Sequence, residues 1–341
     1  MLRTPLCSLL GIDVPIFSAP MGPDITGPDL VAAVSGAGGL GILQSQLSPP
    51  PLLREQIARI RSRTQKPFGV NFLLQFPSDD GIATCIEERV PVLSFFRGEP
   101  PTAAIERAHA AGLKVVYQVG SVAAAARAAR AGVDVVIAQG VEAGGHLAGE
   151  VSTLVLVPRV VEAIAPVPVA AAGGIGDARG VAAVLALGAQ AAVLGTRFLA
   201  SAESHAHPRY KERVVDATEE DTVKTTLFGR GWPNAPHRAI RTRFVEEWLA
   251  SEARGNESRP DEPVVGESEI SGMRVPIVRF TGLPPNARAT GDLEAMGMLA
   301  GQSAGLVRDV RPAGEIVRDL AAGAERIIAR ELLALTLGSG G

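Results

Sequence analysis

The 341-residue chain lacks several features that would assign it to a specialised class of protein. It has only two cysteines, Cys7 and Cys85, with no C-x-x-C pair and no metal-like spacing, so neither a disulfide framework nor a zinc site is indicated. The 33 Lys and Arg residues nearly balance the 36 Asp and Glu residues and form no basic block. This balance argues against nucleic acid or an anionic membrane surface as a partner.

Long apolar runs and targeting signals are also missing. The longest charge-free stretches, 163–176 and 181–196, fall short of the roughly 18 continuous apolar residues of a membrane span and are interrupted by Pro or Gly. The first residues carry one arginine and no small-residue cleavage site. With 46% apolar and 20% charged residues, the chain predicts a large buried core, no membrane partner and a reducing, cytoplasmic location.

Short β-branched runs instead alternate with Ala-rich helical patterns. The runs predict strands at 15–20, 39–43, 68–73, 90–95, 114–119, 134–139, 167–172 and 191–196. The patterns between them predict helices that include 28–38, 50–64, 102–112, 121–132 and 178–188. Parallel neighbouring strands need crossover helices, and eight such units close into a (β/α)8 TIM barrel. A doubly wound open sheet is the alternative, and the count of eight favours the barrel.

The alternation ends near residue 200. Residues 203–310 are richer in charge and proline, with an expected amphipathic helix at 242–254 and a solvated loop at 255–272. A last helix is expected at 313–335. We therefore expect a barrel formed by residues 1–202 and 311–341, with residues 203–310 inserted as a mostly helical cap and substrate segment.

Glycine-rich turns follow two successive predicted strands. AGGIGD (172–177) opens a helix after the seventh strand, and GTRF (195–198) follows the eighth. Glycines let backbone N–H groups approach a phosphate, and a helix N-terminus adds positive potential. Loops after strands seven and eight commonly bind phosphate in such barrels. Tight turns need glycine in any case, but the pair in consecutive units favours phosphate binding.

Polar side chains follow other strands at the same end of the barrel. Asn71 and Gln118 either cap strand ends or bond the edge of a flat heterocycle that lies across the mouth of the barrel. A heterocycle there, together with a phosphate at the glycine-rich turns, suggests FMN. His146 lies in QGVEAGGHLAG (139–149), where glycines let the loop wrap a ligand. An unperturbed imidazole is largely neutral and basic near pH 7, which suits a general base. The alternative is a structural histidine that bonds a loop carbonyl.

His205 and His207 have the H-x-H spacing of metal ligands, but no cluster of Cys or Asp accompanies them, so no metal is expected.

Five segments together resemble the nitronate monooxygenase family, which is FMN-dependent and was formerly called 2-nitropropane dioxygenases. They are SAPMGP (18–23), PFGVNF (67–72), QGVEAGGHLAG (139–149), the long segment 171–201 and AGQSAGLV (300–307). The likeness spans nearly the whole chain. Similar enzymes include NADH:quinone reductases and an FMN-dependent enoyl reductase.

The resemblance implies a site, with His146 as the catalytic base. It places Gln302 and Ser303 near the substrate on the cap side. The implied cofactor-binding residues are Ala19, Pro20, Met21, Asn71, Gln118, Gln139, Gly144, Gly145, Gly173, Gly174, Val193, Leu194, Gly195 and Thr196.

The implied activity is FMN-dependent oxidation of alkyl nitronates, or of nitroalkanes, by O2 to a carbonyl compound and nitrite. The alternative is an NADH-dependent FMN reductase acting on a quinone or enoyl thioester. Some relatives surround an acidic substrate with tyrosines and a lysine, whereas this chain has only Tyr117 and Tyr210, neither of them in the C-terminal segment. A small uncharged nitroalkane or its nitronate is therefore favoured. The sequence leaves a homo-oligomer open.

Overall fold

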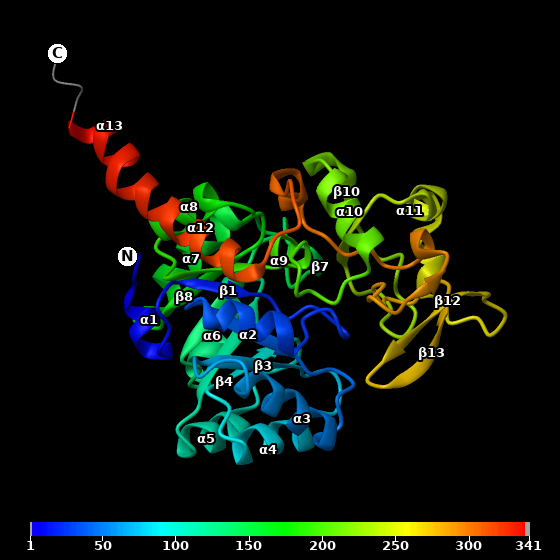
Figure 1. Ribbon diagram of the computed structural model, residues 1–341, viewed down its shortest axis with the longest axis horizontal. Helices are drawn as coiled ribbons and strands as arrows, with labels where there is room; N and C mark the ends of the chain where they lie inside the picture. Colours follow the sequence, from blue (N-terminus) through cyan, green and yellow to red (C-terminus); the bar gives the residue numbers. More distant parts are fainter. Residues whose placement is uncertain (1, 338–341) are drawn as a thin grey trace.

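The computed structural model describes residues 2–337, and its centre is a closed barrel of eight parallel strands in the order β1-β2-β3-β4-β5-β6-β8-β9 (Figure 1). Each of the eight predicted runs supplies one barrel strand, so the (β/α)8 barrel is confirmed. The strands are β1 (Ile16–Ser18), β2 (Leu40–Gln44), β3 (Phe68–Leu73), β4 (Val92–Phe96), β5 (Lys114–Val119), β6 (Val135–Gln139), β8 (Val169–Ala172) and β9 (Ala191–Leu194).

Helices connect the strands around the outside of the barrel. Five were predicted: α2 (Pro28–Gly36), α3 (Pro50–Arg61), α5 (Thr102–Ala110), α6 (Val122–Arg130) and α8 (Ala178–Ala186). The sequence pattern does not indicate α1 (Pro5–Leu10), α4 (Asp79–Glu87) or α7 (Thr153–Ile164). In α7, β-branched residues and an internal Pro158 hide the helical pattern, because both residue types disfavour helix in isolation.

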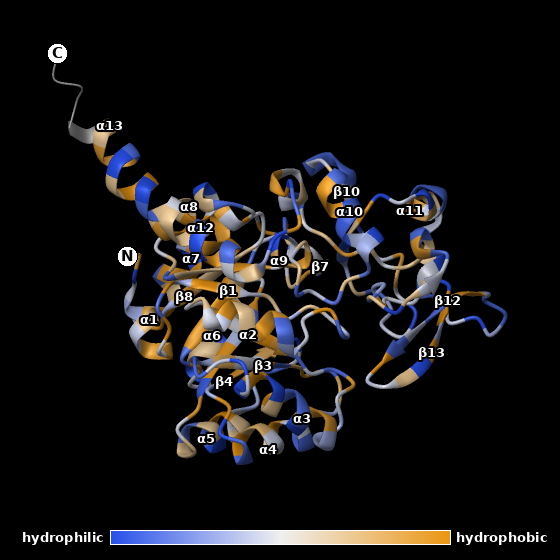
Figure 2. Cartoon of the chain, viewed as in Figure 1, coloured by the Kyte–Doolittle hydropathy of each residue, from blue (hydrophilic) through white to orange (hydrophobic). Residues whose placement is uncertain are grey.

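Two apolar layers stabilise the barrel. Phe17, Ile42 and Val116 belong to the cluster of the strands' inner faces, and Leu6 and Leu10 of α1 pack into the same cluster. Because the Leu6 N–H bonds the side chain of Gln190, which precedes β9, α1 closes the N-terminal mouth of the barrel. The outer strand faces and the helices form a second, larger cluster. Figure 2 shows mostly apolar strands surrounded by helices in which apolar and polar residues are mixed.

The segment 203–310 mixes short helices with two small sheets rather than being mostly helical. One three-stranded sheet has the order β10-β11-β7 and the other β13-β12-β14. Strand β7 (Gly145–His146) of the first sheet comes from the loop after β6. The elements within the segment 203–310 are α10 (Pro208–Asp216), η1 (Glu219–Asp221), β10 (Thr222–Thr225), β11 (His237–Ile240), α11 (Arg243–Trp248), η2 (Leu249–Asn256), β12 (Val264–Ile270), β13 (Met273–Val278), β14 (Thr290–Gly291), η3 (Leu293–Ala295) and η4 (Gln302–Leu306).

Part of the expected solvated loop at 255–272 is therefore strand β12. Its solvent-facing residues include Glu269, while Ser268 and Ile270 on the same strand are buried. Charged residues on the open face of a short hairpin give the same composition as a loop, which explains the difference.

The two ends of the segment 203–310 meet at the barrel. Ser201 and Arg311 form an isolated parallel bridge, and the Ala202 N–H donates to the Arg311 carbonyl over 2.9 Å. The predicted last helix then begins with α12 (Ala313–Arg326), which packs against α8 and α2, and continues through a π-helical turn (Ile327–Leu332) into α13 (Leu333–Leu337). In Figure 1 this last stretch projects beyond the barrel.

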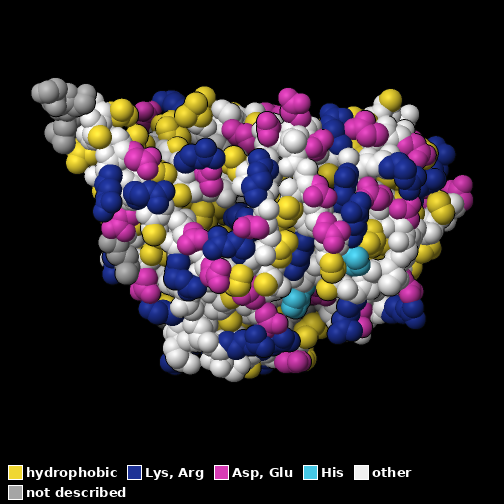
Figure 3. All heavy atoms as spheres, turned by 45° about the horizontal axis from the view of Figure 1, so that its top comes forward, with side chains coloured by type: hydrophobic (Ala, Val, Ile, Leu, Met, Phe, Trp, Pro, Cys, Tyr) yellow, Lys and Arg dark blue, Asp and Glu magenta, His cyan; other side chains and the backbone are white. Residues whose placement is uncertain are grey.

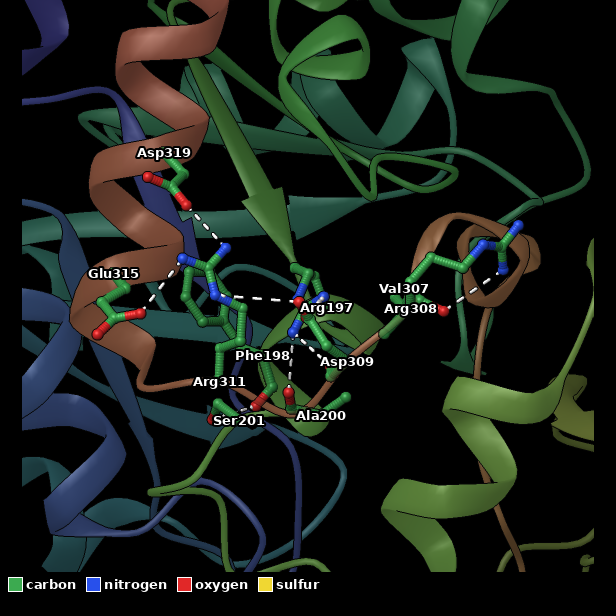
Figure 4. Close-up of polar contacts among 10 residues, drawn as sticks. All are labelled: Arg197, Phe198, Ala200, Ser201, Val307, Arg308, Asp309, Arg311, Glu315 and Asp319. Carbon is green, nitrogen blue, oxygen red and sulfur yellow. Dashed lines mark hydrogen bonds and ion pairs between the residues drawn. The ribbon is translucent and has the colours of Figure 1, made fainter.

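A buried arginine stabilises the junction where the two ends of the segment 203–310 meet the barrel. Arg197 lies in the short helix α9 (Thr196–Leu199), with only 9% of its side chain exposed. Its guanidinium donates to the carbonyls of Ala200 and Asp309 and pairs with the Asp309 carboxylate at 3.0 Å (Figure 4). Arg311 extends the network to Glu315 and Asp319 on α12.

The surface carries charges of both signs. Figure 3 shows Lys and Arg side chains interspersed with Asp and Glu over the visible face. None of the helices among residues 2–337 combines the length and apolar character that crossing a bilayer requires.

We expect Arg197→Met to lower the free energy of unfolding by about 3 kcal/mol, because it removes a buried charged donor from the buried Ala200 carbonyl and from the carbonyl and half-exposed carboxylate of Asp309. Urea unfolding measures the change. Arg159→Met is the matched control: Arg159 and its partner Glu162 are 63% and 65% exposed, so the change should stay within about 0.5 kcal/mol. Equal losses in the two variants would show that the junction does not depend on Arg197.

Candidate functional site

A cavity of about 360 Å³ opens at the carboxyl ends of the barrel strands. Loops after the strands form its floor, and residues from 228–232 and 281–284 of the inserted segment form its roof. Its volume lies within the usual range of small-molecule sites.

Most of the predicted site residues line this cavity. They are Ala19, Pro20, Met21, Asn71, Gln118, Gln139, Gly144, Gly145, His146, Gly173, Gly174, Val193, Gly195, Thr196 and Ser303. Leu194 and Gln302 do not. The Leu194 side chain is buried in the outer core. Its backbone carbonyl accepts a hydrogen bond from the N–H of Ala19, which lines the cavity. The Gln302 side chain is exposed, and its N–H donates to the Glu142 carbonyl.

The glycine turns after β8 and β9 present unpaired donors to the cavity. Gly173 and Gly174 have φ values of +105° and +71°, which favour glycine. Within residues 2–337, the N–H groups of Gly173, Gly174 and Gly195 make no hydrogen bond. The start of α8 is different, because the Asp177 carboxylate accepts from the Arg179 and Gly180 N–H groups. The donors available to a phosphate are therefore those of the turns rather than those of the helix.

Two hydroxyl groups lie at the same end of the cavity. Thr196 Oγ1 accepts from the Gly301 N–H over 2.9 Å, which leaves the hydroxyl proton available to a ligand. Ser303 is 5% exposed, and a Cβ added at Gly176 would lie 3.1 Å from the Ser303 carbonyl oxygen. Ser303 thus lies beside the glycine turns rather than over the centre of the barrel.

Three side-chain amides differ in their availability. Asn71 Oδ1 accepts from the Ser94 hydroxyl, and its NH2 group has no partner in the described chain. Gln118 makes no side-chain hydrogen bond there either. Gln139 is committed to its own loop, since it donates to the His146 carbonyl and accepts from the Ala148 N–H. Asn71 and Gln118 are therefore the amides that could bond a heterocycle.

His146 is held in place through its backbone. β7 pairs with β11, with His146 opposite His237. Neither imidazole nitrogen of His146 has a hydrogen-bond partner in residues 2–337, and Nε2 is fully buried. The ring stacks on Trp232 with 3.7 Å between centroids and contacts His237 edge-on at 5.5 Å. A buried polar side chain without a partner points to a ligand.

The surroundings keep His146 uncharged. Burial, followed by the nearby His237 and Arg97, lowers the pKa of His146 to about 2. No Asp, Glu or Lys is among the described residues that line the cavity, and Tyr210 there donates its hydroxyl to the Leu299 carbonyl. His146 is thus the one side chain of the described lining that could accept a proton from a bound molecule.

Several neighbours of the site were not predicted. Trp232 and Arg97 contact the His146 region, and Gln44 and Phe228 line the cavity. The available signal was Trp232, one of two tryptophans in the chain, flanked by Gly and Pro in GRGWPNAP.

Three other histidines do not line the cavity and contact groups elsewhere in the described chain. His237 is fully buried and bonds the Phe228 N–H and the Ala235 carbonyl. His207 caps α10, and His205 lies 3.7 Å from the Asp29 carboxylate.

The chain is similar to known proteins over most of its length. A family model described as nitronate monooxygenase matches residues 3–82 and 74–323. A curated relative from Mycobacterium tuberculosis is named (3aS,4S,5R,7aS)-5-hydroxy-7a-methyl-1-oxo-octahydro-1H-indene-4-carboxyl-CoA dehydrogenase. It is 39% identical over 258 residues, which cover 74% of this chain and 71% of the relative.

Two solved structures are similar over nearly their whole length. FabK from Thermotoga maritima is 38% identical with a TM-score of 0.80, covering 98% of this chain and 100% of that one. A nitroalkane oxidase from Streptomyces ansochromogenes is 30% identical with a TM-score of 0.77, covering 96% and 99%.

Gly195→Ala tests whether a ligand approaches the glycine turns. The φ of Gly195 is −98°, and an added Cβ would meet only Ala19 and Met21 at 3.6 and 3.9 Å, so the protein itself tolerates alanine. Gly174→Val would confound the test, because φ at Gly174 is +71°. We expect Gly195→Ala to weaken flavin retention about tenfold or more, measured as the flavin-to-protein absorbance ratio after dialysis.

Gly36→Ala, with its nearest neighbour at 3.7 Å and remote from the cavity, is the control and should retain its flavin. Full flavin occupancy in Gly195→Ala would mean that this loop is an ordinary turn.

Proposed function

Because this chain belongs to the nitronate monooxygenase family, we propose that it oxidises alkyl nitronates with FMN and molecular oxygen to a carbonyl compound and nitrite. Membership makes the protein a flavin-dependent oxidoreductase that acts on a small molecule. The identity of the flavin as FMN, the use of O2 and the nitronate substrate are the proposed parts.

The observation that carries the proposal is the position of His146. Its uncharged imidazole lies at the cavity, has no hydrogen-bond partner in the part of the chain that the structure describes, and meets no carboxylate among the lining residues there. A neutral imidazole of this kind can accept the α-proton of a nitroalkane at one ring nitrogen or donate its single N–H to an oxygen of a nitronate. A strongly lowered pKa makes the ring a weaker base than an exposed histidine. This favours substrates that arrive already deprotonated.

The cofactor-binding roles follow from the donors available. We propose that the N–H groups of Gly173, Gly174 and Gly195, with the Thr196 hydroxyl, hold the phosphate of FMN. When bound, FMN supplies the capacity to accept electrons from the substrate. The amides of Asn71 and Gln118 would bond the edge of its ring, and the backbone of 19–21 would lie beneath it. Ser303, beside the glycine turns, joins the phosphate end in this proposal.

The inserted segment 203–310 is proposed as the substrate-binding cap over a barrel formed by 1–202 and 311–341. Phe228, Trp232, Leu283 and Leu299 supply a mainly apolar roof to the cavity, and Arg230 is its charged member. This lining suits a small substrate with an apolar chain.

The protein should release FMN, and not FAD, on heating. The cavity offers one set of phosphate donors at the glycine turns, and the sequence has no fingerprint for an adenylate. Chromatography of the released cofactor decides the matter, and FAD from protein expressed with ample riboflavin contradicts the proposal.

His146→Asn tests the base directly. The change keeps a polar side chain of similar size, so FMN should stay bound. Activity on nitroethane should fall about 100-fold or more, the usual worth of a positioned base. Activity on pre-formed ethylnitronate should fall much less, because that substrate has already lost its proton. Steady-state rates of oxygen uptake and nitrite release on both substrates give the two losses.

Equal losses on the two substrates would show that His146 positions the ligand without taking a proton. Undiminished turnover of nitroethane would remove His146 from the mechanism.

A second candidate is supported by the names of the more similar relatives. The relative at 39% identity is named a CoA-ester dehydrogenase, and FabK at 38% is more similar in sequence than the nitroalkane oxidase at 30%. The alternative is therefore an NADH-dependent FMN reductase acting on an enoyl thioester or a quinone. Mixing the flavin-loaded protein with NADH without oxygen separates the two. Rapid bleaching supports the reductase, whereas no bleaching together with nitronate-dependent oxygen uptake supports the monooxygenase.

A further inference from the structure

An aromatic stack covers His146 on the side of the inserted segment. The indole of Trp232 lies almost parallel to the imidazole, with an interplanar angle of 20° and 3.7 Å between centroids. Phe76, in the loop after β3, meets the other edge of the indole at 5.8 Å in a T-shaped contact. Trp232, Phe76 and His146 all line the cavity, so the stack forms part of its wall.

Arg97 holds the stack from the barrel side. It follows β4, and its guanidinium carbon lies 5.2 Å from the centroid of the Trp232 ring. Its Nη2 donates to the carbonyl of Leu147, the residue next to His146, over 2.8 Å. Arg97 has no carboxylate partner in the described chain, its buried Nε makes no hydrogen bond, and its φ is +63°. A non-glycine residue in this conformation is uncommon, so its placement indicates a specific local requirement.

The loop that carries Trp232 joins β10 to β11, and β11 is also the strand that pairs with His146. The Leu147 N–H donates to the Pro236 carbonyl in the same loop. The backbone that fixes His146 and the backbone that carries the indole are thus bonded to each other.

We propose that Trp232 is a positioning residue for His146: its indole, held by Arg97, fixes the plane of the imidazole and separates the ring from bulk water. This proposal rests on the proposed role of His146 as the base. The stack replaces the carboxylate that commonly orients a catalytic histidine, and no such carboxylate contacts His146 within residues 2–337.

Two charged or titratable groups face the imidazole. His237 approaches from β11, and Arg97 approaches from the end of β4. Glu142, in the same loop as His146, instead accepts hydrogen bonds from Thr153. None of these groups stabilises an imidazolium, so exposure to water is what would restore ordinary titration to the ring.

The experiment compares Trp232→Ala with Trp232→Phe in the FMN-loaded protein. Side-chain NMR of 13C-labelled histidine follows the titration of His146, whose signal is assigned by its loss in His146→Asn. In the wild type and in Trp232→Phe, His146 should not titrate between about pH 5 and 8. In Trp232→Ala it should titrate with a pKa rising toward ~6.5. The control is Trp248→Phe, because Trp248 packs on Phe244 and Phe280, away from His146.

The same variants are compared for kcat/KM on nitroethane as a function of pH. The wild type and Trp232→Phe should show no loss from His146 protonation down to pH 5.5. Trp232→Ala should lose about tenfold between pH 7.5 and 5.5, since an imidazole of ordinary pKa is mostly protonated at the lower value.

If Trp232→Ala does not fold, Arg97→Met removes the support of the indole and the neighbouring positive charge, and the same titration should appear. An unchanged His146 titration in a folded Trp232→Ala or Arg97→Met protein overturns the proposal.

The NMR readout needs no turnover, so it also tests this proposal separately from the proposed function. Absent nitronate oxidation with the expected titration shift would leave Trp232 as the positioning residue of a different reaction.

Discussion

The site depends on one loop, residues 139–149, being rigid enough to hold an imidazole that makes no hydrogen bond with any of residues 2–337. Burying an unpartnered polar ring costs free energy, and such a ring would turn toward water if its backbone could move. The loop resists this because polar side chains are committed to it. Gln139 bonds the loop at both ends of its amide, Glu142 binds Thr153, and Arg238 donates to the Val141 carbonyl. The position of His146 is thus maintained by Gln139, which lines the cavity, and by Glu142 and Arg238, which do not.

Backbone contacts also connect this loop to the opposite end of the cavity. Gly144 lets the loop meet the inserted segment closely, since an added Cβ would lie 2.4 Å from the Gly301 nitrogen. Gly301 in turn donates to Thr196 after β9. The loop of the histidine, the cap and the glycine turn are therefore coupled through backbone contacts.

The barrel and most of the cavity lining could be predicted from the sequence because both follow from local order. Alternating strands and helices define a parallel barrel, and its carboxyl-end loops must converge. Trp232 and Arg97 could not be found this way. Their contacts with the His146 region join segments far apart in the chain, and no periodic pattern encodes a stack of that kind. Gln302 is predicted as a site residue from a local sequence motif. In the structure its side chain is exposed, and only its backbone faces inward.

The bridge between Ser201 and Arg311 brings the two ends of the inserted segment side by side at the barrel. A loop whose ends are already adjacent costs little more to close when it lengthens, because the closure entropy grows only with the logarithm of its length. The barrel can therefore keep its own geometry while the segment between these residues changes in size or sequence. Residues 228–232 and 281–284, which form the roof of the cavity, lie between these two ends, so a change in this segment can alter the roof without altering the barrel.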